Sequence, residues 1–155
     1  MANTWLLEWN PIRWCLDRED DFFTYEELAQ DIEQIGFAIG KWSCAMTTDI
    51  QEGDRIFLMR VGTQPKGIMA AGIALSSVFM GKNWDENKRA LGKPVRRIYI
   101  RFESVSCDFQ RHILPLETLR LIAPEYDWTP YGSGYRIPPE VASKLEEAWL
   151  KARQK

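Results

Sequence analysis

The sequence predicts an α+β domain, built as a small mixed β-barrel flanked by helices. Several short strand patterns are separated by turn residues, and helical patterns lie near the beginning and near the end of the chain. The 155 residues, 45% of them hydrophobic, are enough for one core but not for two independent ones. We therefore expect a single domain over residues 1–155, without repeats or linkers.

The first strand and the first helix are predicted from local signals. Residues 4–9 are rich in large apolar side chains and are followed by a turn at Asn10-Pro11. Thr24 and Glu27 then form a capping box. Apolar residues follow at helical spacing until Gly36, namely Tyr25, Leu28, Ile32 and Ile35. This amphipathic helix is expected to lie against a sheet.

A hairpin is predicted in the middle of the chain. After a polar stretch that begins at Lys41, the turn 52–54 leads into a strand over 55–60. The glycine- and proline-containing segment 61–67 reverses the chain, and 68–78 forms the second strand. Gly72 lies inside this second strand, where it predicts a bulge or a bend.

Further along, residues 79–94 are expected to form a long polar loop. Residues 95–102 alternate as a half-buried strand does, with Ile98, Ile100 and Phe102 on one face and Arg97, Tyr99 and Arg101 on the other. One face of this strand is therefore predicted to be apolar and the other basic.

The end of the chain is predicted to contain two helices. A short helix opens at Pro115 and ends before Pro124, and 127–135 is a loop rich in glycine, serine and aromatic residues. Pro138-Pro139 starts the last helix, whose apolar stripe consists of Val141, Leu145, Ala148 and Trp149.

Composition excludes several classes of site. The three cysteines (Cys15, Cys44 and Cys107) are widely spaced, and His112 is the only histidine, so we expect neither a metal site nor a cofactor. No stretch approaches the roughly 20 apolar residues of a membrane span, and the N-terminus does not resemble a secretion signal. We expect a cytoplasmic protein with no membrane contact.

Charge is distributed unevenly although the formal net charge is only -2. Residues 17–33 contain eight acidic residues against Arg18 alone, whereas 82–111 contain eight basic residues against four acidic ones. The basic segment is suited to face phosphates, and its candidate contacts are Lys88, Arg89, Lys93, Arg96, Arg97 and Arg101. A solvated surface has the same composition, so charge alone assigns no partner.

Seven tryptophans are many for a chain of this length. Trp5, Trp128 and Trp149 are interpreted as core residues. The other four have polar neighbours typical of turns and loops, where an indole can present its face to a ligand; these are Trp9, Trp14, Trp42 and Trp84.

The order of several motifs resembles that of EVE domains over nearly the whole chain. These motifs are Trp5 to Trp14 (WLLEWNPIRW), Gly40 to Ser43 (GKWS), Gly53 to Gly62 (GDRIFLMRVG), Gly67 to Gly72 (GIMAAG), Asn83 to Asp85 (NWD) and Ser133-Gly134. The sequence is most similar to the EVE modules that are fused to HNH nucleases in modification-dependent restriction. No HNH portion is present in it.

The resemblance implies a PUA-like fold and a function as a reader of bases, since EVE domains are related to the YTH readers of methylated adenine. It implies that Trp42 and Trp84 sandwich a flipped, modified base, that Ser43 and Asn10 meet its polar edge, and that Ser133 and Gly134 lie near the pocket mouth. Trp9 and Trp14 would border the same pocket. The implied partner is nucleic acid, with DNA favoured over RNA, together with a fused or separate nuclease.

Three other functions remain open at this point. No activated nucleophile, carboxylate pair or phosphate-binding loop is recognisable, so we expect no catalysis, but a small ASCH-like hydrolase of modified nucleosides would need only a lysine and a carboxylate. A PUA-like module can also bind RNA, and a stacking pocket does not distinguish the sugars. Exposed aromatic residues are equally suited to a protein partner.

Overall fold

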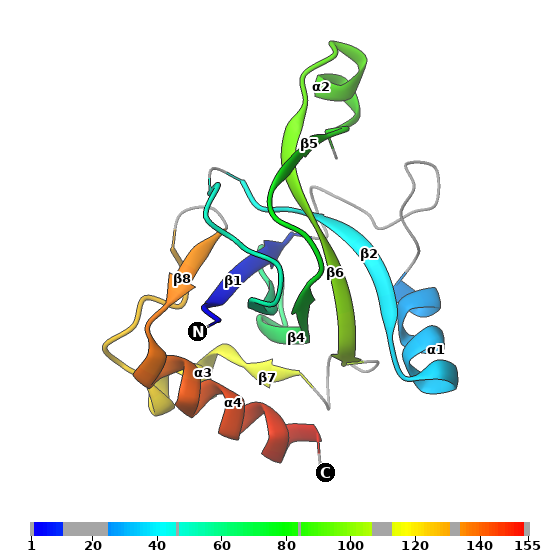
Figure 1. Ribbon diagram of the computed structural model, residues 1–155. Coiled ribbons are helices and arrows are strands. Elements are labelled where there is room, and N and C mark those ends of the chain that lie inside the picture. The colour runs from blue at the N-terminus through cyan, green and yellow to red at the C-terminus, as the bar shows by residue number, and fades with distance from the viewer. Residues whose placement is uncertain are drawn as a thin grey trace.

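A mixed β-sheet forms the centre of the molecule (Figure 1). The computed structural model describes residues 2–10, 25–45, 47–83, 85–106, 113–130 and 134–153. Within these ranges the strands are β1 (Thr4–Trp9), β2 (Ala38–Ser43), β3 (Arg55–Arg60), β4 (Gly67–Ala74), β5 (Phe79–Gly81), β6 (Val95–Val105), β7 (Leu114–Pro115) and β8 (Tyr135–Ile137). The helices are α1 (Tyr25–Ile35), α2 (Glu86–Ala90), α3 (Leu116–Ile122) and α4 (Pro139–Arg153).

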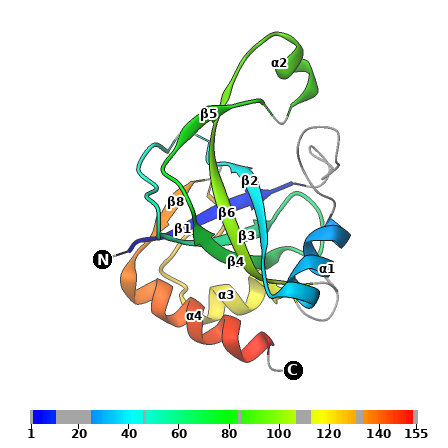
Figure 2. The same ribbon diagram turned by 45° about the vertical axis from the view of Figure 1, so that its right-hand side comes forward.

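The strand order is β2-β6-β4-β3-β1-β8, with β5 added to β6 and β7 added to β4. β1 runs parallel to β3, and the other pairs are antiparallel. In both views α1 lies beside β2 and β6, whereas α3 and α4 lie together at the end of the molecule opposite α2 (Figures 1 and 2). The chain is therefore the predicted α+β fold, a mixed sheet flanked by helices; among the described strands the sheet is not closed into a full barrel, because β2 and β8 at its two ends are not paired with each other. Among the described residues, no helix is long and apolar enough to cross a membrane.

The sheet separates two hydrophobic cores. Along β1 the side chains alternate, so Trp5 and Leu7 join one core together with Leu28 of α1. Leu6 points to the other core, which α4 covers with Trp149. Burying both faces of the central strands explains why β3 and β4 are apolar along nearly their whole length.

Many of the predicted elements are confirmed. β1, α1 and β3 have the expected bounds, and Val141, Leu145 and Trp149 of α4 are buried as the apolar stripe required. The predicted irregularity at Gly72 is also present, since the register between β4 and β6 shifts there. A Cβ atom at Gly72 would clash with the carbonyl oxygen of Arg101, so glycine permits the close approach of the two strands.

The main differences concern elements that long-range pairing creates. The segment 79–94, expected to be a loop, contains β5 and α2, because β5 forms by pairing with β6 and α2 is a short helix of five residues. The stretch around Lys41 belongs to β2, and β4 ends at Ala74 instead of continuing to 78. In β2 the buried positions include Ala38, which has only a methyl side chain, and Gly40, which has none, so no apolar alternation can be recognised.

Candidate nucleic-acid interface

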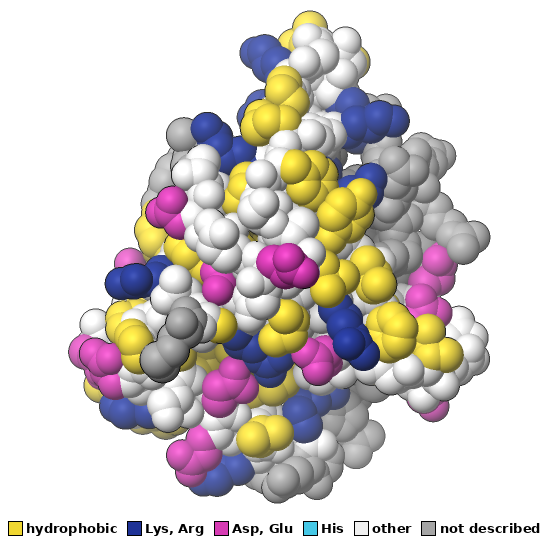
Figure 3. Space-filling model, in the orientation of Figure 1, with side chains coloured by type: hydrophobic (Ala, Val, Ile, Leu, Met, Phe, Trp, Pro, Cys, Tyr) yellow, Lys and Arg dark blue, Asp and Glu magenta, His cyan; other side chains and the backbone are white. Residues whose placement is uncertain are grey.

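Residues 79–97 form an arm that projects from the rest of the molecule (Figures 1 and 2). The arm consists of β5, α2 and the first part of β6. It contains two acidic residues, Asp85 and Glu86, and six basic ones: Lys82, Lys88, Arg89, Lys93, Arg96 and Arg97. Asp85 caps α2 by accepting hydrogen bonds from the backbone N–H groups of residues 87 and 88, at 2.9 and 3.3 Å. The arm is thus the most basic part of the described fold, and Lys and Arg side chains flank it in Figure 3.

A pocket of about 410 Å³ lies within the arm. Three of its lining residues are cations and none is a carboxylate; the lining consists of Met80, Gly81, Lys82, Asn83, Arg89, Gly92, Lys93 and Pro94. Asn83 is 7% exposed, and its carbonyl oxygen accepts a hydrogen bond from Nη1 of Arg89 at 2.9 Å. This bond holds the guanidinium at the pocket while Lys82 and Lys93 add further charge. The pocket is electrostatically suited to a phosphate group.

The six predicted phosphate contacts differ in position and in exposure. Lys88, Arg89, Lys93 and Arg96 belong to the arm, whereas Arg101 lies lower on β6, with its Cζ atom 4.5 Å from the ring centre of Phe37. Arg97 is 1% exposed, and its Nε donates to the carbonyl oxygen of Lys82 at 2.6 Å. The expectation that Arg97 lies on an exposed face is wrong, because its side chain packs against Gly81 at the end of β5 and binds the carbonyl oxygen of Lys82. Lys82 was not among the predicted contacts, although it directly precedes the Asn83-Trp84 motif.

The second region of interest is the closing edge, where the ends of β1 and β2 and the residue before β8 meet. It consists of Glu8, Trp42, Cys44 and Gly134. Nε1 of Trp42 donates a hydrogen bond to the backbone oxygen of Glu8 at 3.2 Å, which joins β2 to β1. The N–H of Gly134 donates to the carbonyl oxygen of Leu6 at 3.0 Å, and a Cβ atom at Gly134 would lie 2.6 Å from the carbonyl oxygen of Cys44. These contacts bring the two outer strands of the sheet together.

The tryptophans of this region are buried. Trp42 is 1% exposed and packs edge-on against Phe102, with ring centres 6.3 Å apart, while Trp9 is 6% exposed in the same core. Both were expected to present a face to a ligand beside polar residues, but both are buried; Trp9 ends the predicted strand β1, whereas Trp42 lies in β2, a strand that was not predicted. Their polar neighbours, such as Lys41 and Ser43, point to the opposite face of the strand, as strand alternation requires. Trp14, Trp84 and Ser133 lie outside the described residues.

The other predicted base contacts lie at the ends of these strands. Asn10 follows β1, and its side chain occupies the place where a Cβ atom at Gly62 would be. Ser43 ends β2, and its Oγ accepts a hydrogen bond from the N–H of Ala45 at 3.4 Å. The structure therefore brings Ser43 and Gly134 to the two strand ends that meet at the closing edge, and Asn10 to the end of the neighbouring strand.

Two titratable side chains of the closing edge have shifted pKa values. Glu8 is half-buried, and burial raises its pKa from 4.5 to about 7. Burial likewise raises the pKa of Cys44 to about 11, against a smaller lowering by Arg96 and Arg97. The thiol is therefore protonated at neutral pH and is no nucleophile, whereas Glu8 can exchange a proton there. No group of three or more metal-ligating side chains occurs among the described residues.

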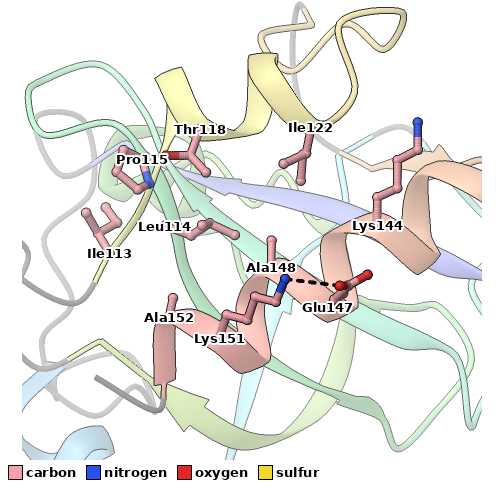
Figure 4. Close-up of a pocket in the computed structure, with 10 residues that line it drawn as sticks. All are labelled: Ile113, Leu114, Pro115, Thr118, Ile122, Lys144, Glu147, Ala148, Lys151 and Ala152. Carbon is pink, nitrogen blue, oxygen red and sulfur yellow. Dashed lines mark ion pairs between the residues drawn. The ribbon is translucent and has the colours of Figure 1, made fainter.

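A larger groove of about 590 Å³ lies at the opposite end of the molecule, between β7, α3 and α4 (Figure 4). Its walls are mainly apolar, with Ile113, Leu114, Pro115, Ile122, Ala148 and Ala152 among the lining residues. The charged residues at the groove are compensated: Lys151 pairs with Glu147 at 3.1 Å, and Lys144 with Glu125 at 3.6 Å. This groove does not have the positive charge that a nucleic-acid contact needs.

No protein-family model and no curated protein matches the chain. Solved structures do resemble it: a hypothetical protein from Leishmania major has 11% identity and a TM-score of 0.67, with 100% of this chain and 98% of that chain covered. A structural-genomics target from Pseudomonas syringae has 15% identity and a TM-score of 0.58, with 94% and 99% covered. A point mutant of the ASCH protein from Zymomonas mobilis has 10% identity and a TM-score of 0.53, with 94% and 98% covered. At such identities these structures show the fold alone, which this chain shares with them over nearly its whole length.

Proposed function

We propose that this chain is a non-catalytic nucleic-acid reader that holds a flipped, modified base between the arm and the closing edge. The observation that carries the proposal is the arm pocket, whose lining includes Lys82, Arg89 and Lys93 but no carboxylate. A phosphate of the backbone next to the flipped base is the ligand that this chemistry favours. DNA is the favoured target, and a fused or separate nuclease is the favoured partner.

The energetics of base flipping agree with a site in which an aromatic ring binds the base and the arm binds the neighbouring phosphate. Extruding a base costs a few kcal/mol, and stacking it on an aromatic ring returns about 1–3 kcal/mol. Phosphate contacts in the arm supply the remainder, which makes the affinity dependent on salt. A methyl group adds only about 0.8 kcal/mol on burial, so preference for a modified base depends mainly on whether polar groups find partners.

The burial of Trp42 changes the role that we assign to it. A ring that is 1% exposed and bonded to the backbone of Glu8 acts first as a support for the closing edge. The ring proposed to stack on the base is that of Trp84, which in the sequence follows Asn83 of the arm pocket. Ser43 and Asn10 remain the proposed partners of the polar edge of the base.

The proposal can be tested by fluorescence anisotropy with labelled oligonucleotides. Duplex DNA, single-stranded DNA and single-stranded RNA, each with and without a methylated or hydroxymethylated base, are titrated with the protein at several salt concentrations. We expect binding that weakens steeply with salt and that prefers a modified base, and Trp84→Ala should remove this preference. Binding that does not depend on salt, or no binding to any of these oligonucleotides, would contradict the proposal.

A second candidate is an ASCH-like hydrolase of modified nucleosides, and Glu8 is the observation that favours it. A half-buried carboxyl with a pKa of about 7 is suited to general acid-base chemistry at neutral pH. Incubation with N-methylated or N-acylated nucleosides, followed by chromatography of the products, tests this function. Turnover that Glu8→Gln abolishes would support the hydrolase, and absence of turnover with folded protein would leave the reader as the function.

A further inference from the structure

A stripe of partly or fully exposed aromatic, aliphatic and basic side chains follows the outer face of β2 and β6 and the residues beside them. We call it the stripe; it consists of Phe37, Ile39, Lys41, Phe79, Tyr99 and Arg101. Tyr99 is 40% exposed and Ile39 is 51% exposed, which is unusual for large apolar groups that share one face of a sheet. In Figure 3 hydrophobic side chains continue from the arm down over this face, with Lys and Arg side chains among them.

The strand register places rings and cations side by side. Lys41 lies directly opposite Tyr99, and Ile39 lies opposite Arg101. Nζ of Lys41 is 5.9 Å from the centre of the Tyr99 ring. One step further, Cζ of Arg101 is 4.5 Å from the centre of the Phe37 ring. Each step along β6 thus presents one flat or apolar surface together with one positive charge.

The ring of Tyr99 is also held in place from the arm. Phe79 of β5 stacks on it, with ring centres 5.0 Å apart and an angle of 28° between the rings. Because Phe79 begins the arm, the stripe continues directly from the basic pocket without a break in the sheet. A fixed ring loses little conformational entropy when a planar ligand binds, and this favours stacking.

We infer that the stripe is a stacking surface for single-stranded nucleic acid that leaves the base site through the arm. The inference rests on the proposed function. Residues two apart on a strand are about 6.6 Å apart, which is close to the distance between successive nucleotides of an extended single strand. Stacking needs unpaired bases, so the stripe selects single strands over duplexes. Glu103, 3.9 Å from Arg55 in an ion pair, marks the acidic lower end of the stripe.

The experiment compares oligothymidine and oligouridine probes of two lengths, one that fills the base site only and one that extends beyond it. The variants are Tyr99→Ala, Tyr99→Phe as the conservative change, and Arg101→Gln. Leu121→Ala is the matched control, because Leu121 is 82% exposed on α3 at the opposite end of the molecule. In parallel, probes that carry 5-iodouracil are crosslinked by ultraviolet light, and the crosslinked peptides are identified by mass spectrometry.

We expect Tyr99→Ala to weaken binding of the long probes roughly ten-fold while leaving the short ones unchanged. Tyr99→Phe and Leu121→Ala should bind as the parent does, and crosslinks should map to β5 and β6. If the parent binds both lengths and Tyr99→Ala binds them equally well, the stripe is not a nucleic-acid surface, although the proposed function stands. A parent that binds no probe would overturn the stripe as a nucleic-acid surface, whereas the proposed function is decided by the oligonucleotides that carry a modified base.

Discussion

The arm and the closing edge were expected to form two halves of one site, but the lysines of the arm face a pocket whereas the tryptophan of the closing edge is buried. In the arm, Lys82 and Lys93 line an open pocket. At the closing edge, Trp42 is buried and its indole N–H bonds to the backbone of Glu8. The comparison teaches that the face of a strand, and not the polarity of the neighbours in sequence, decides whether a tryptophan meets a ligand or supports the fold.

The largest effect that follows from this comparison concerns stability. Trp42→Ala should lower the free energy of unfolding by about 3–5 kcal/mol, because it opens a cavity in the core and leaves the backbone oxygen of Glu8 without its indole donor. Lys82→Gln with Lys93→Gln should leave stability nearly unchanged. Urea unfolding followed by circular dichroism measures both. Equal stability of Trp42→Ala and the parent would place Trp42 outside the core.

The two lysine substitutions, which should hardly change stability, are expected to have a large effect on binding. Lys82→Gln with Lys93→Gln should weaken all oligonucleotides alike, by the order of ten-fold, and lower the salt slope by about 0.7–0.9 for each lost phosphate contact. Preference between bases should remain. The control is Lys144→Gln with Lys151→Gln at the apolar groove, which removes the same charge from a place where acidic partners compensate it. If both pairs reduce affinity equally, net charge and not the arm pocket governs binding.

A smaller and more local effect is expected at Gly62. Its φ angle is +84°, and an added Cβ atom would displace the side chain of Asn10. Gly62→Ala should cost about 1 kcal/mol in stability and alter the base preference, while the salt slope stays as in the parent. The same anisotropy titrations, together with urea unfolding, measure these quantities. An unchanged preference would remove Asn10 from the set of base contacts.

The last expected effect concerns the dependence of stability on pH. Because burial raises the pKa of Glu8 to about 7, the folded protein keeps a proton that the unfolded chain releases above pH 4.5. The contribution of Glu8 therefore lowers the free energy of unfolding as the pH rises from about 4.5 to about 7, and is constant above. Glu8→Gln should remove this decrease. Urea titrations at several pH values test it, and parallel pH curves for parent and variant would argue against the shift.

Local patterns predicted much of the fold. The capping box at Thr24 and the stop at Gly36 were sufficient for α1, and the large apolar residues of 4–9 for β1, because these signals are contained within a few neighbouring residues. β5 and β8, with three residues each, could not be predicted in this way. They are strands only because β6 and β1 lie beside them, and such pairing has no signature in the short segments themselves.

The candidate site was predictable in part for the same reason. The clustering of basic residues after Lys82 could be recognised, since charge remains visible in the sequence whatever the fold, and the structure places most of these residues in the arm. The burial of Arg97 and Trp42 was not predictable, because each contacts a segment distant in sequence: Gly81 and Lys82 contact the side chain of Arg97, and β1 accepts the hydrogen bond of Trp42. Tyr99 could be recognised as part of a candidate binding surface only from its stacking with Phe79, a contact that the sequence does not show.

The tip of the arm also has an evolutionary consequence. Residues 82–94 leave β5 and return to β6 at Gly81 and Val95, which the sheet pairs directly. The ends of this segment are therefore about 5 Å apart whatever lies between them, and closing a somewhat longer or shorter segment changes the entropy only slowly. Insertions, deletions and changes of charge can therefore accumulate in residues 82–94 while the sequence of the sheet stays the same. Proteins with this fold can in this way change their ligand by changing the tip of the arm alone.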